Sequence, residues 1–226
     1  MSRGELVRRY LLFIVSLFCI GLGVALTKHA ELGVSPMSSV ANVMSVRFDF
    51  WSFGAWLTAS NCLLLVGQIL LLRRRFKPIQ LLQIPLSFLF GYFTDLGLWL
   101  ASLIPNDLYV SKLAIVLGGV VVLGFGITLG VIASVLLNSC EAFVAALADV
   151  TGKSFGNVKI AFDVSCVAIT ILLSLVFFDG RLCGLREGTV ISALLVGVMV
   201  KLFKRLIGER LDRVLRSPSV KQETEK

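Results

Sequence analysis

The chain has 226 residues and a net charge of +8, with 57% hydrophobic and 16% charged residues. A typical soluble domain is less apolar and carries about 25% charged residues, so this composition excludes an ordinary water-soluble globule. Six membrane spans of about 20 residues would occupy roughly 120 positions, which leaves no room for a separate soluble enzyme domain. We therefore expect an all-α polytopic protein whose first partner is the lipid bilayer.

Six apolar runs follow one another along the chain, separated by short polar segments. Each is close to the length of about 20 residues that a helix needs to cross the hydrocarbon core. We expect residues 1–206 to form a single transmembrane domain and residues 207–226 to form a charged cytoplasmic tail. The predicted spans are 10–27, 52–72, 79–104, 112–137, 157–178 and 188–206.

The basic residues stand in short blocks between these runs. Such blocks set the orientation of a membrane protein, because Lys and Arg are retained on the cytoplasmic side. Placing the amino end inside puts 17 of the 22 Lys and Arg in the cytoplasm and 5 outside, so we expect both termini to be cytoplasmic. Nucleic-acid binding would need a basic stripe on one folded surface, and no nucleic-acid partner is expected.

The first run is repeated in the fourth. Residues 21–26, Gly-Leu-Gly-Val-Ala-Leu, match residues 124–129, Gly-Phe-Gly-Ile-Thr-Leu, at an offset of 103. Further matches align residues 52–54 with 154–156, Asn61 with Asp163 and, more weakly, Gly91 with Gly197.

The chain thus divides into two halves, about 10–105 and 112–206, with three spans each. An odd number of spans forces the second half to enter the membrane from the opposite side, which predicts an inverted repeat of the kind found in many secondary transporters. A duplicated scaffold that transports nothing is the alternative.

Each half also contains a segment that is too short to cross. Pro36 to Phe48 and Ser139 to Val150 have about 12 residues, or roughly 18 Å of helix, against a bilayer core of about 30 Å. Ser35 before Pro36, and Asn138 three residues before Glu141 in a capping-box pattern, predict helix starts at equivalent places.

We expect two half-helices whose amino ends attract an anionic group, because these ends carry free N–H groups and a positive partial charge. Amphipathic helices that lie flat at the membrane interface are the alternative. The candidate substrate-binding residues are Ser35, Pro36, Ser38, Asn61, Asn138, Ser139 and Glu141.

Carboxylates inside the spans are candidate proton carriers, because a charge in hydrocarbon is costly and usually faces a cavity or the bundle interior. Asp163 in the fifth span is the first candidate and Asp95 in the third is the second. The alternatives are that Asp163 reaches to water at the interface, that Asp95 caps a neighbouring helix, and that Glu141 serves only its capping box.

Other chemistry has little support in the sequence. There is no Ser–His–acid set, H-E-x-x-H motif or P-loop lysine, so we expect neither an enzyme nor a cofactor. The five cysteines lack metal-ligand spacing and predict no metal site and no disulfide. They are Cys19, Cys62, Cys140, Cys166 and Cys183.

Several segments together resemble a known family. Over about residues 10–206 the chain is similar to the YczE/YyaS/YitT family of bacterial integral membrane proteins. The residues that carry the resemblance are 30–36 (Ala-Glu-Leu-Gly-Val-Ser-Pro), 154–156 (Ser-Phe-Gly), 188–191 (Gly-Thr-Val-Ile) with Gly197, and Gln83, Pro85, Phe88, Gly91 and Asp95 within 81–95. The resemblance implies a bacterial plasma-membrane protein of largely unassigned activity. The second half has Leu136-Leu137-Asn138-Ser139 where the first has Gly33-Val34-Ser35-Pro36, so the two half-sites need not bind alike.

The expected function is transport of a small molecule or ion, with proton coupling as a further possibility. The alternative is a non-transporting scaffold or accessory protein, and a homo-oligomer stays open in both cases. A polar cavity at the candidate residues would favour the transporter, and a dry, uniformly packed interior would favour the scaffold.

Overall fold

The computed structural model describes residues 3–178 and 185–215. In these ranges the chain is helical and contains no strand, which confirms the all-α prediction. Arg181, Cys183 and the end of the expected tail, 216–226, lie outside the described residues. The elements are α1 (Arg3–His29), α2 (Pro36–Arg47), α3 (Phe53–Leu72), the short 3-10 helices η1 (Arg73–Arg75) and η2 (Pro78–Leu82), α4 (Gln83–Ala101), α5 (Tyr109–Ala133), α6 (Ser139–Thr151), α7 (Phe155–Phe177) and α8 (Glu187–Leu215).

Five helical segments are long and apolar enough to cross a membrane, so the protein is membrane-embedded. They are 4–29, 53–75, 78–101, 109–133 and 155–177. The sixth predicted span, 188–206, lies in α8, whose apolar part ends at Lys201. Because α8 continues to Leu215, residues 207–215 are its last turns and not a separate tail. The predicted span 112–137 is shortened, since Ser134 adopts a left-handed conformation and ends α5 at Ala133.

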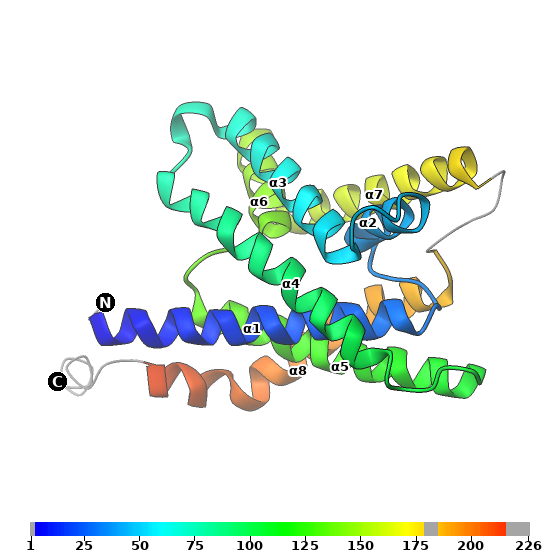
Figure 1. Ribbon diagram of the computed structural model, residues 1–226. Helices are drawn as coiled ribbons and strands as arrows, with labels where there is room; N and C mark the ends of the chain where they lie inside the picture. The colour runs from blue at the N-terminus through cyan, green and yellow to red at the C-terminus, as the bar shows by residue number, and fades with distance from the viewer. Residues whose placement is uncertain (1–2, 179–184, 216–226) are drawn as a thin grey trace.

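The helices form two bodies (Figure 1). Helices α1, α5 and α8 run side by side, with the beginning of α1 and the end of α8 at the same end of the molecule. Helices α2, α3, α6 and α7 form the second body. Helix α4 joins the two, because it packs on both α1 and α3.

Helices α1 and α5 cross at glycines. The contact that α1 makes with α5 matches the contact that α5 makes with α1. A Cβ atom on Gly23 would lie 2.7 Å from the backbone nitrogen of Leu123. A Cβ atom on Gly126 would lie 2.8 Å from the backbone nitrogen of Ile20. Ile20 and Leu123 occupy equivalent positions, as do Gly23 and Gly126, so each helix presents the same small-residue surface to the other.

The third helix of each half packs on the first in the same way. Gly21 of α1 lies against Phe93 and Thr94 of α4, and Gly124 of α5 lies against Met199 and Val200 of α8. Two further contacts between the halves are equivalent: α2 of the first half packs on α7 of the second, and α6 of the second half packs on α3 of the first. One pair departs from this pattern, because α3 packs on α4 whereas α7 does not pack along α8 in the part of the chain that is described.

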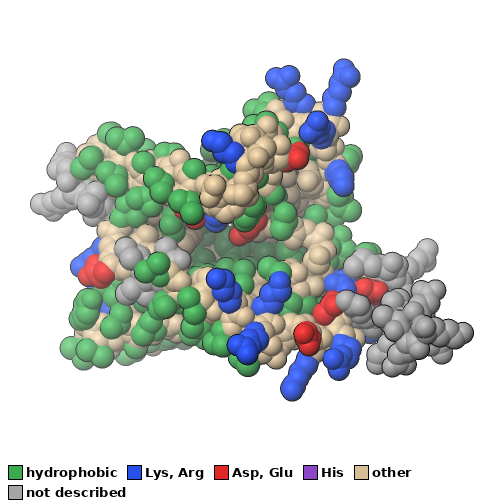
Figure 2. Space-filling view, turned by 180° about the vertical axis from the view of Figure 1, so that it is seen from behind, with side chains coloured by type: hydrophobic (Ala, Val, Ile, Leu, Met, Phe, Trp, Pro, Cys, Tyr) green, Lys and Arg blue, Asp and Glu red, His purple; other side chains and the backbone are tan. Residues whose placement is uncertain are grey.

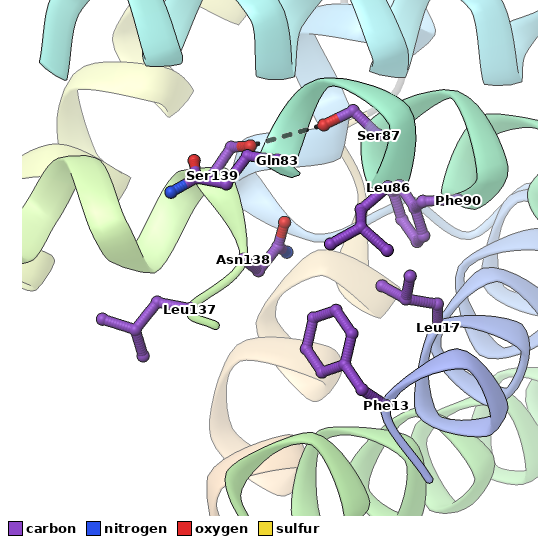
Figure 3. A pocket seen from close by; sticks show the side chains of 9 residues that line it. All are labelled: Phe13, Leu17, Gln83, Leu86, Ser87, Phe90, Leu137, Asn138 and Ser139. Atoms are coloured by element: carbon purple, nitrogen blue, oxygen red, sulfur yellow. Dashed lines mark hydrogen bonds between the residues drawn. The ribbon is translucent and has the colours of Figure 1, made fainter. Parts of the chain in front are cut away.

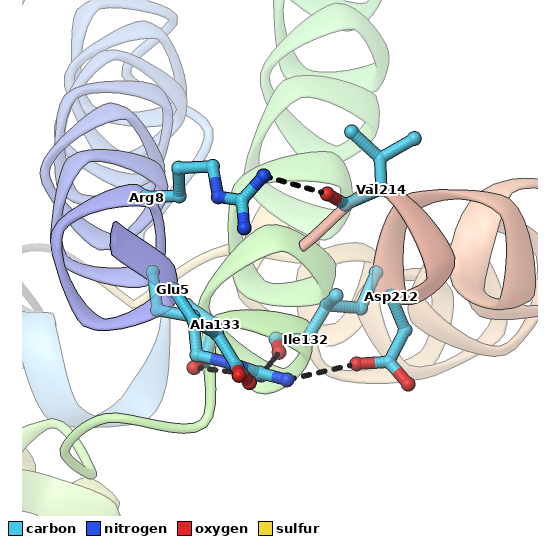
Figure 4. Close-up of polar contacts among 7 residues, drawn as sticks. Glu5, Arg8, Ile132, Ala133, Asp212 and Val214 are labelled. Atoms are coloured by element: carbon cyan, nitrogen blue, oxygen red, sulfur yellow. Dashed lines mark hydrogen bonds and ion pairs between the residues drawn. The ribbon is translucent and has the colours of Figure 1, made fainter. Parts of the chain in front are cut away.

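Arg9 connects the three helices of the first body at one end; Figure 4 labels its partners Glu5, Ile132, Ala133 and Asp212. Its buried guanidinium donates hydrogen bonds to the carbonyls of Ile132 and Ala133, at 3.1 and 3.3 Å, where α5 ends. It also pairs with Glu5 of α1 at 3.0 Å and with Asp212 of α8 at 3.2 Å. The last carbonyls of a helix lack partners within that helix. Arg9 donates hydrogen bonds to two of them in α5 and also pairs with two carboxylates.

The two short helices begin inside the protein and end at opposite ends of it (Figure 1). The end of α2 lies beside the end of α1, where Lys28 Nζ donates to Ser45 Oγ at 2.8 Å. The end of α6 lies beside the end of α3, where Asp149 pairs with Arg75 at 3.7 Å. Val43 and Val144 are fully buried, so these helices are packed into the protein and do not lie flat on its surface.

The loop before α2 is fixed to the beginning of α8. The Gly188 N–H donates to the Leu32 carbonyl at 2.7 Å. Gly33 has a φ of +108° and faces the Thr189 side chain, so a side chain at this position is excluded by both backbone conformation and space. Nearby, a hydrogen bond from Lys112 lowers the pKa of Glu31 below its usual value.

The glycine crossing predicts a difference between two substitutions. Gly23→Ala places a methyl group against the backbone of α5 and should destabilise the protein by about 1–3 kcal/mol. Gly118→Ala, in α5, meets nothing within 4 Å and should be neutral or slightly stabilising, because alanine favours helix. Thermal unfolding of both variants in the same detergent checks this. Equal unfolding temperatures would contradict close packing at Gly23.

Candidate functional site

A cavity of about 310 Å³ lies between the two bodies. Figure 2 shows the hollow, with apolar side chains inside it and acidic and basic side chains at its edge. Its wall includes the beginnings of both α2 and α6, apolar residues of α1 and α5, and polar residues of α7 and α8. Of the predicted site residues, Ser35, Pro36, Ser38, Asn138, Glu141 and Asp163 line this cavity.

At the start of α2, Ser35 and Pro36 occupy the N-cap and first helical positions, as predicted. The expected capping bond is absent, however, because Ser35 Oγ donates to Ser38 Oγ at 3.0 Å and accepts no backbone N–H. Ser38 is itself buried. The hydroxyls therefore form a pair at the cavity wall, and the first N–H groups of α2 keep no partner from Ser35.

The start of α6 also lacks its predicted cap. Asn138 stands at the N-cap, but its side chain accepts no hydrogen bond from the helix. The Oε2 atom of Glu141 is buried and has no hydrogen-bond partner among the described residues. The predicted capping box is therefore wrong: the Asn138 side chain points into the crevice beside α4 (Figure 3), and the Glu141 carboxylate lies at the cavity.

Helix α7 contributes an ion pair to the wall. Lys159 Nζ lies 2.7 Å from Asp163 Oδ1, one helical turn away, and both side chains are 31% exposed. Lys159 Nζ also lies 3.9 Å from Cys140 Sγ of α6. Lys159 is one of the 17 basic residues whose distribution indicates the orientation of the protein in the membrane. Its spacing of four residues from Asp163 is also the spacing of a helical ion pair.

Ser139 lies beside the cavity and not in its wall. It is buried, and its Oγ lies 3.4 Å from Ser87 Oγ of α4 (Figure 3). The small crevice at this contact shares Phe13, Leu17 and Asn138 with the cavity wall. Ser139 therefore holds the start of α6 against α4.

Two further predicted residues lie away from the cavity wall. Asn61 is completely buried in α3, and neither atom of its amide has a partner in the described ranges. Asp95 caps α3: its Oδ1 accepts the Gly54 N–H at 2.8 Å, and its Oδ2 accepts the Ser52 hydroxyl at 2.5 Å. The sequence placed Asn61 at the site through its alignment with Asp163, but Asn61 is not among the residues that line the cavity.

Sequence reasoning missed Ser192 of α8. It lines the cavity, is 1% exposed, and its Oγ has no partner within residues 3–178 and 185–215. A single serine in an apolar run gives no usable signal, because serine and threonine in membrane helices usually bond to their own helix. Four cysteines, Cys19, Cys62, Cys140 and Cys166, are free thiols.

Comparison with known proteins gives a family without a function. Residues 7–205 match a family of unknown function (DUF6198), and the chain belongs to it. No curated protein and no solved structure matches the chain.

The structure predicts that Asp95 matters more for stability than Ser35. Asp95→Ala removes the acceptor for two donors at the start of α3 and should cost about 1–2 kcal/mol. Ser35→Ala removes only one hydroxyl contact and should cost less. Thermal unfolding and proteolysis of the two variants check this. A larger loss for Ser35→Ala would contradict the observed capping.

Proposed function

We propose that the protein is a plasma-membrane transporter of a small molecule, built as a six-span inverted repeat with both termini in the cytoplasm. The observation that carries the proposal is the cavity, where the starts of two half-helices from opposite halves meet. In secondary transporters, interrupted helices of this kind form the substrate site near the bilayer midplane. The two helices end at opposite faces of the protein, as the inverted repeat requires.

The matching contacts between the two halves support the inverted repeat. The contacts of Gly23 with Leu123 and of Gly126 with Ile20 are related by the offset of 103 residues. Helices α1 and α5 run in opposite directions, because the beginning of α1 at Arg9 meets the end of α5 at Ala133. On this proposal α8 is the sixth span, with its apolar part along α5.

The α3–α4 and α7–α8 helix pairs differ in how closely they pack, and this difference suggests an access route to the cavity. Between α3 and α4, Gly54 lies in contact with the Gly91 carbonyl. At the equivalent positions of α7 and α8, a Cβ on Gly156 or Gly197 would meet nothing within 4 Å among the described residues. We take this gap as the entrance to the cavity: closure of α7 on α8, with opening of α3 from α4, would expose the site to the other side.

Charge explains why the two pairs differ. Asp95 of α4 ties the beginning of α3 to α4. By the same offset that relates Gly91 to Gly197, the equivalent residue of α8 is Lys201. A lysine cannot accept the N–H groups at a helix start, and its charge opposes the positive end of the helix dipole. The second pair therefore lacks the bond that holds the first one closed.

A non-transporting scaffold, the alternative that the sequence left open, would need no such interior. A uniformly packed core excludes voids larger than a few water molecules. The cavity wall here contains Glu141, Lys159 and Asp163, and burial of charged groups is costly unless they serve a function or are paired. The combination of volume and charge favours transport.

A cysteine introduced at the cavity wall provides a test that needs no substrate. Met37 lines the cavity and is only partly buried; with Met37→Cys as the only cysteine, an impermeant thiol reagent should modify it from both faces of a vesicle. Gly156→Leu should leave thermal unfolding unchanged, because its side chain meets open space, but should block closure of α7 on α8 and restrict labelling to one face. Gly118→Leu is the control of equal size. Cysteines beside Arg74 and Asn106 report the inner and outer face, respectively.

Two results would contradict the proposal. Failure of the cysteine introduced by Met37→Cys to react from either face would favour the scaffold. Labelling of the Arg74 site from outside, with the Asn106 site protected, would reverse the orientation.

Proton coupling is proposed through Asp163. A proton on this carboxylate would remove the charge that holds Lys159; Glu141 and Cys140 of α6 face the same pair. In proteoliposomes with an imposed proton gradient, Asp163→Asn should abolish gradient-driven uptake of a labelled metabolite panel, and Asp95→Asn should preserve it. Full gradient dependence in Asp163→Asn would exclude coupling through this carboxylate.

A further inference from the structure

We propose that the cavity binds a small zwitterion with an apolar body, which is the chemistry of an α-amino acid with an aliphatic side chain. The inference rests on the proposed function in taking the cavity as the substrate site. It follows from the groups at the cavity wall that are left without partners.

The start of α2 provides the site for the carboxylate. Pro36 has no N–H, and the first hydrogen bond within the helix is made by Ser39, which donates to the Ser35 carbonyl. The N–H groups of Met37 and Ser38 precede this bond, and Ser35 does not accept them. Free N–H groups at a helix start, together with the positive end of the dipole, favour a carboxylate.

Glu141 provides the site for the ammonium group. Three charged side chains line the described cavity wall: Glu141, Lys159 and Asp163. Lys159 and Asp163 pair at 2.7 Å, whereas the Oε2 atom of Glu141 has no hydrogen-bond partner among the described residues. A carboxylate oxygen left without a partner in an interior is unfavourable, and a bound cation relieves it.

Ser192 is a third unsatisfied group, independent of the two helix starts. Its Oγ is buried on α8 and faces the cavity without a partner among the described residues. A buried hydroxyl without a hydrogen bond is costly, and a polar group of the ligand can supply one. The site therefore has polar contacts on α2, α6 and α8.

The opposite wall is apolar. It is formed by side chains of α1 and α5 that include Leu17, Ile20, Val24, Leu123 and Ile127. The cavity volume of about 310 Å³ is at the lower end of the range for small-molecule sites, about 300–1,000 Å³. A compact aliphatic body fits this wall.

The charges distinguish a zwitterion from simpler ligands. A monocarboxylate would satisfy the start of α2 but would leave Glu141 unpaired and repel it. An amine would satisfy Glu141 but would leave the donors of α2 unpaired. A ligand that carries both groups satisfies both sites with no change in protonation, and recognition of paired polar groups gives strong discrimination.

Three ligands with one carbon skeleton test the inference: leucine, 4-methylpentanoate, which lacks the amine, and 3-methylbutylamine, which lacks the carboxylate. Binding to the purified full-length protein is measured by calorimetry and thermal shift. Leucine should raise the unfolding temperature, because a ligand that binds only the folded state stabilises it. It should bind at least about tenfold more tightly than either analogue.

Substitution of Glu141 tests whether its carboxylate binds the ammonium group. Glu141→Gln should weaken leucine binding by about 30-fold or more, the loss expected when one partner of a buried charge pair is removed. It should also bring leucine and 4-methylpentanoate to similar affinities. Asp149→Asn is the control, because it removes an exposed carboxylate from the far end of the same helix. Equal leucine affinity in wild type and Glu141→Gln would overturn the assignment.

The outcomes separate this inference from the proposed function. Equal or tighter binding of 4-methylpentanoate would indicate an anion site, and equal or tighter binding of 3-methylbutylamine would indicate a cation site; either overturns the zwitterion. If none of the three binds at millimolar concentration while the cysteine introduced by Met37→Cys is still labelled from both faces, the zwitterion is wrong and the transporter stands. If leucine binds but does not cross proteoliposomes, the binding site stands and transport is wrong.

Discussion

The close approach of α1 and α5 at their glycines is the contact on which the rest of the fold depends. Lipid tails are as apolar as the helices, so helices in a membrane associate through packing and polar contacts, and small residues allow their backbones to meet. Gly23 and Gly126 provide this approach in the second half of each helix. Each helix then carries one further helix on its other glycine, Gly21 or Gly124.

The second body is held less tightly, and this leaves room for the cavity. Its four helices contact the first body mainly through α4, which packs on α1 and on α3. Within the described ranges α7 does not pack along α8 as α3 packs on α4, and only a few residues of α7 are buried: Val158, Cys166, Thr170 and Ser174. The interior near α7 therefore stays open, and the polar groups of α2, α6 and α8 face that opening.

The sequence predicted the helical class, the positions of five spans and the starts of both short helices, because length, hydropathy and proline or serine at a helix start are local signals. It did not predict the hydrogen bonds at those starts. Ser35 and Asn138 have acceptor atoms, but which donor each meets depends on side chains from other helices.

At the candidate site, too, the sequence identified residues but not the contacts that they make. Asp163 and Asp95 are both carboxylates within predicted spans, and the sequence ranked Asp163 first without showing which of them meets a cavity. Contacts decide between them: Asp95 is occupied by the backbone of α3, whereas Asp163 lies at the cavity with Lys159. Ser192 was missed because a lone hydroxyl acquires meaning only when its surroundings offer it no partner.

The glycine crossing has a consequence for the origin of the protein. Gly23 meets Leu123 as Gly126 meets Ile20, so the surface that joins the halves is complementary to its own duplicate. A surface of this kind forms an isologous dimer without a covalent link. On the proposed inverted repeat, a single ancestral half inserted in the membrane in both orientations would assemble with itself, before fusion of two copies into one chain.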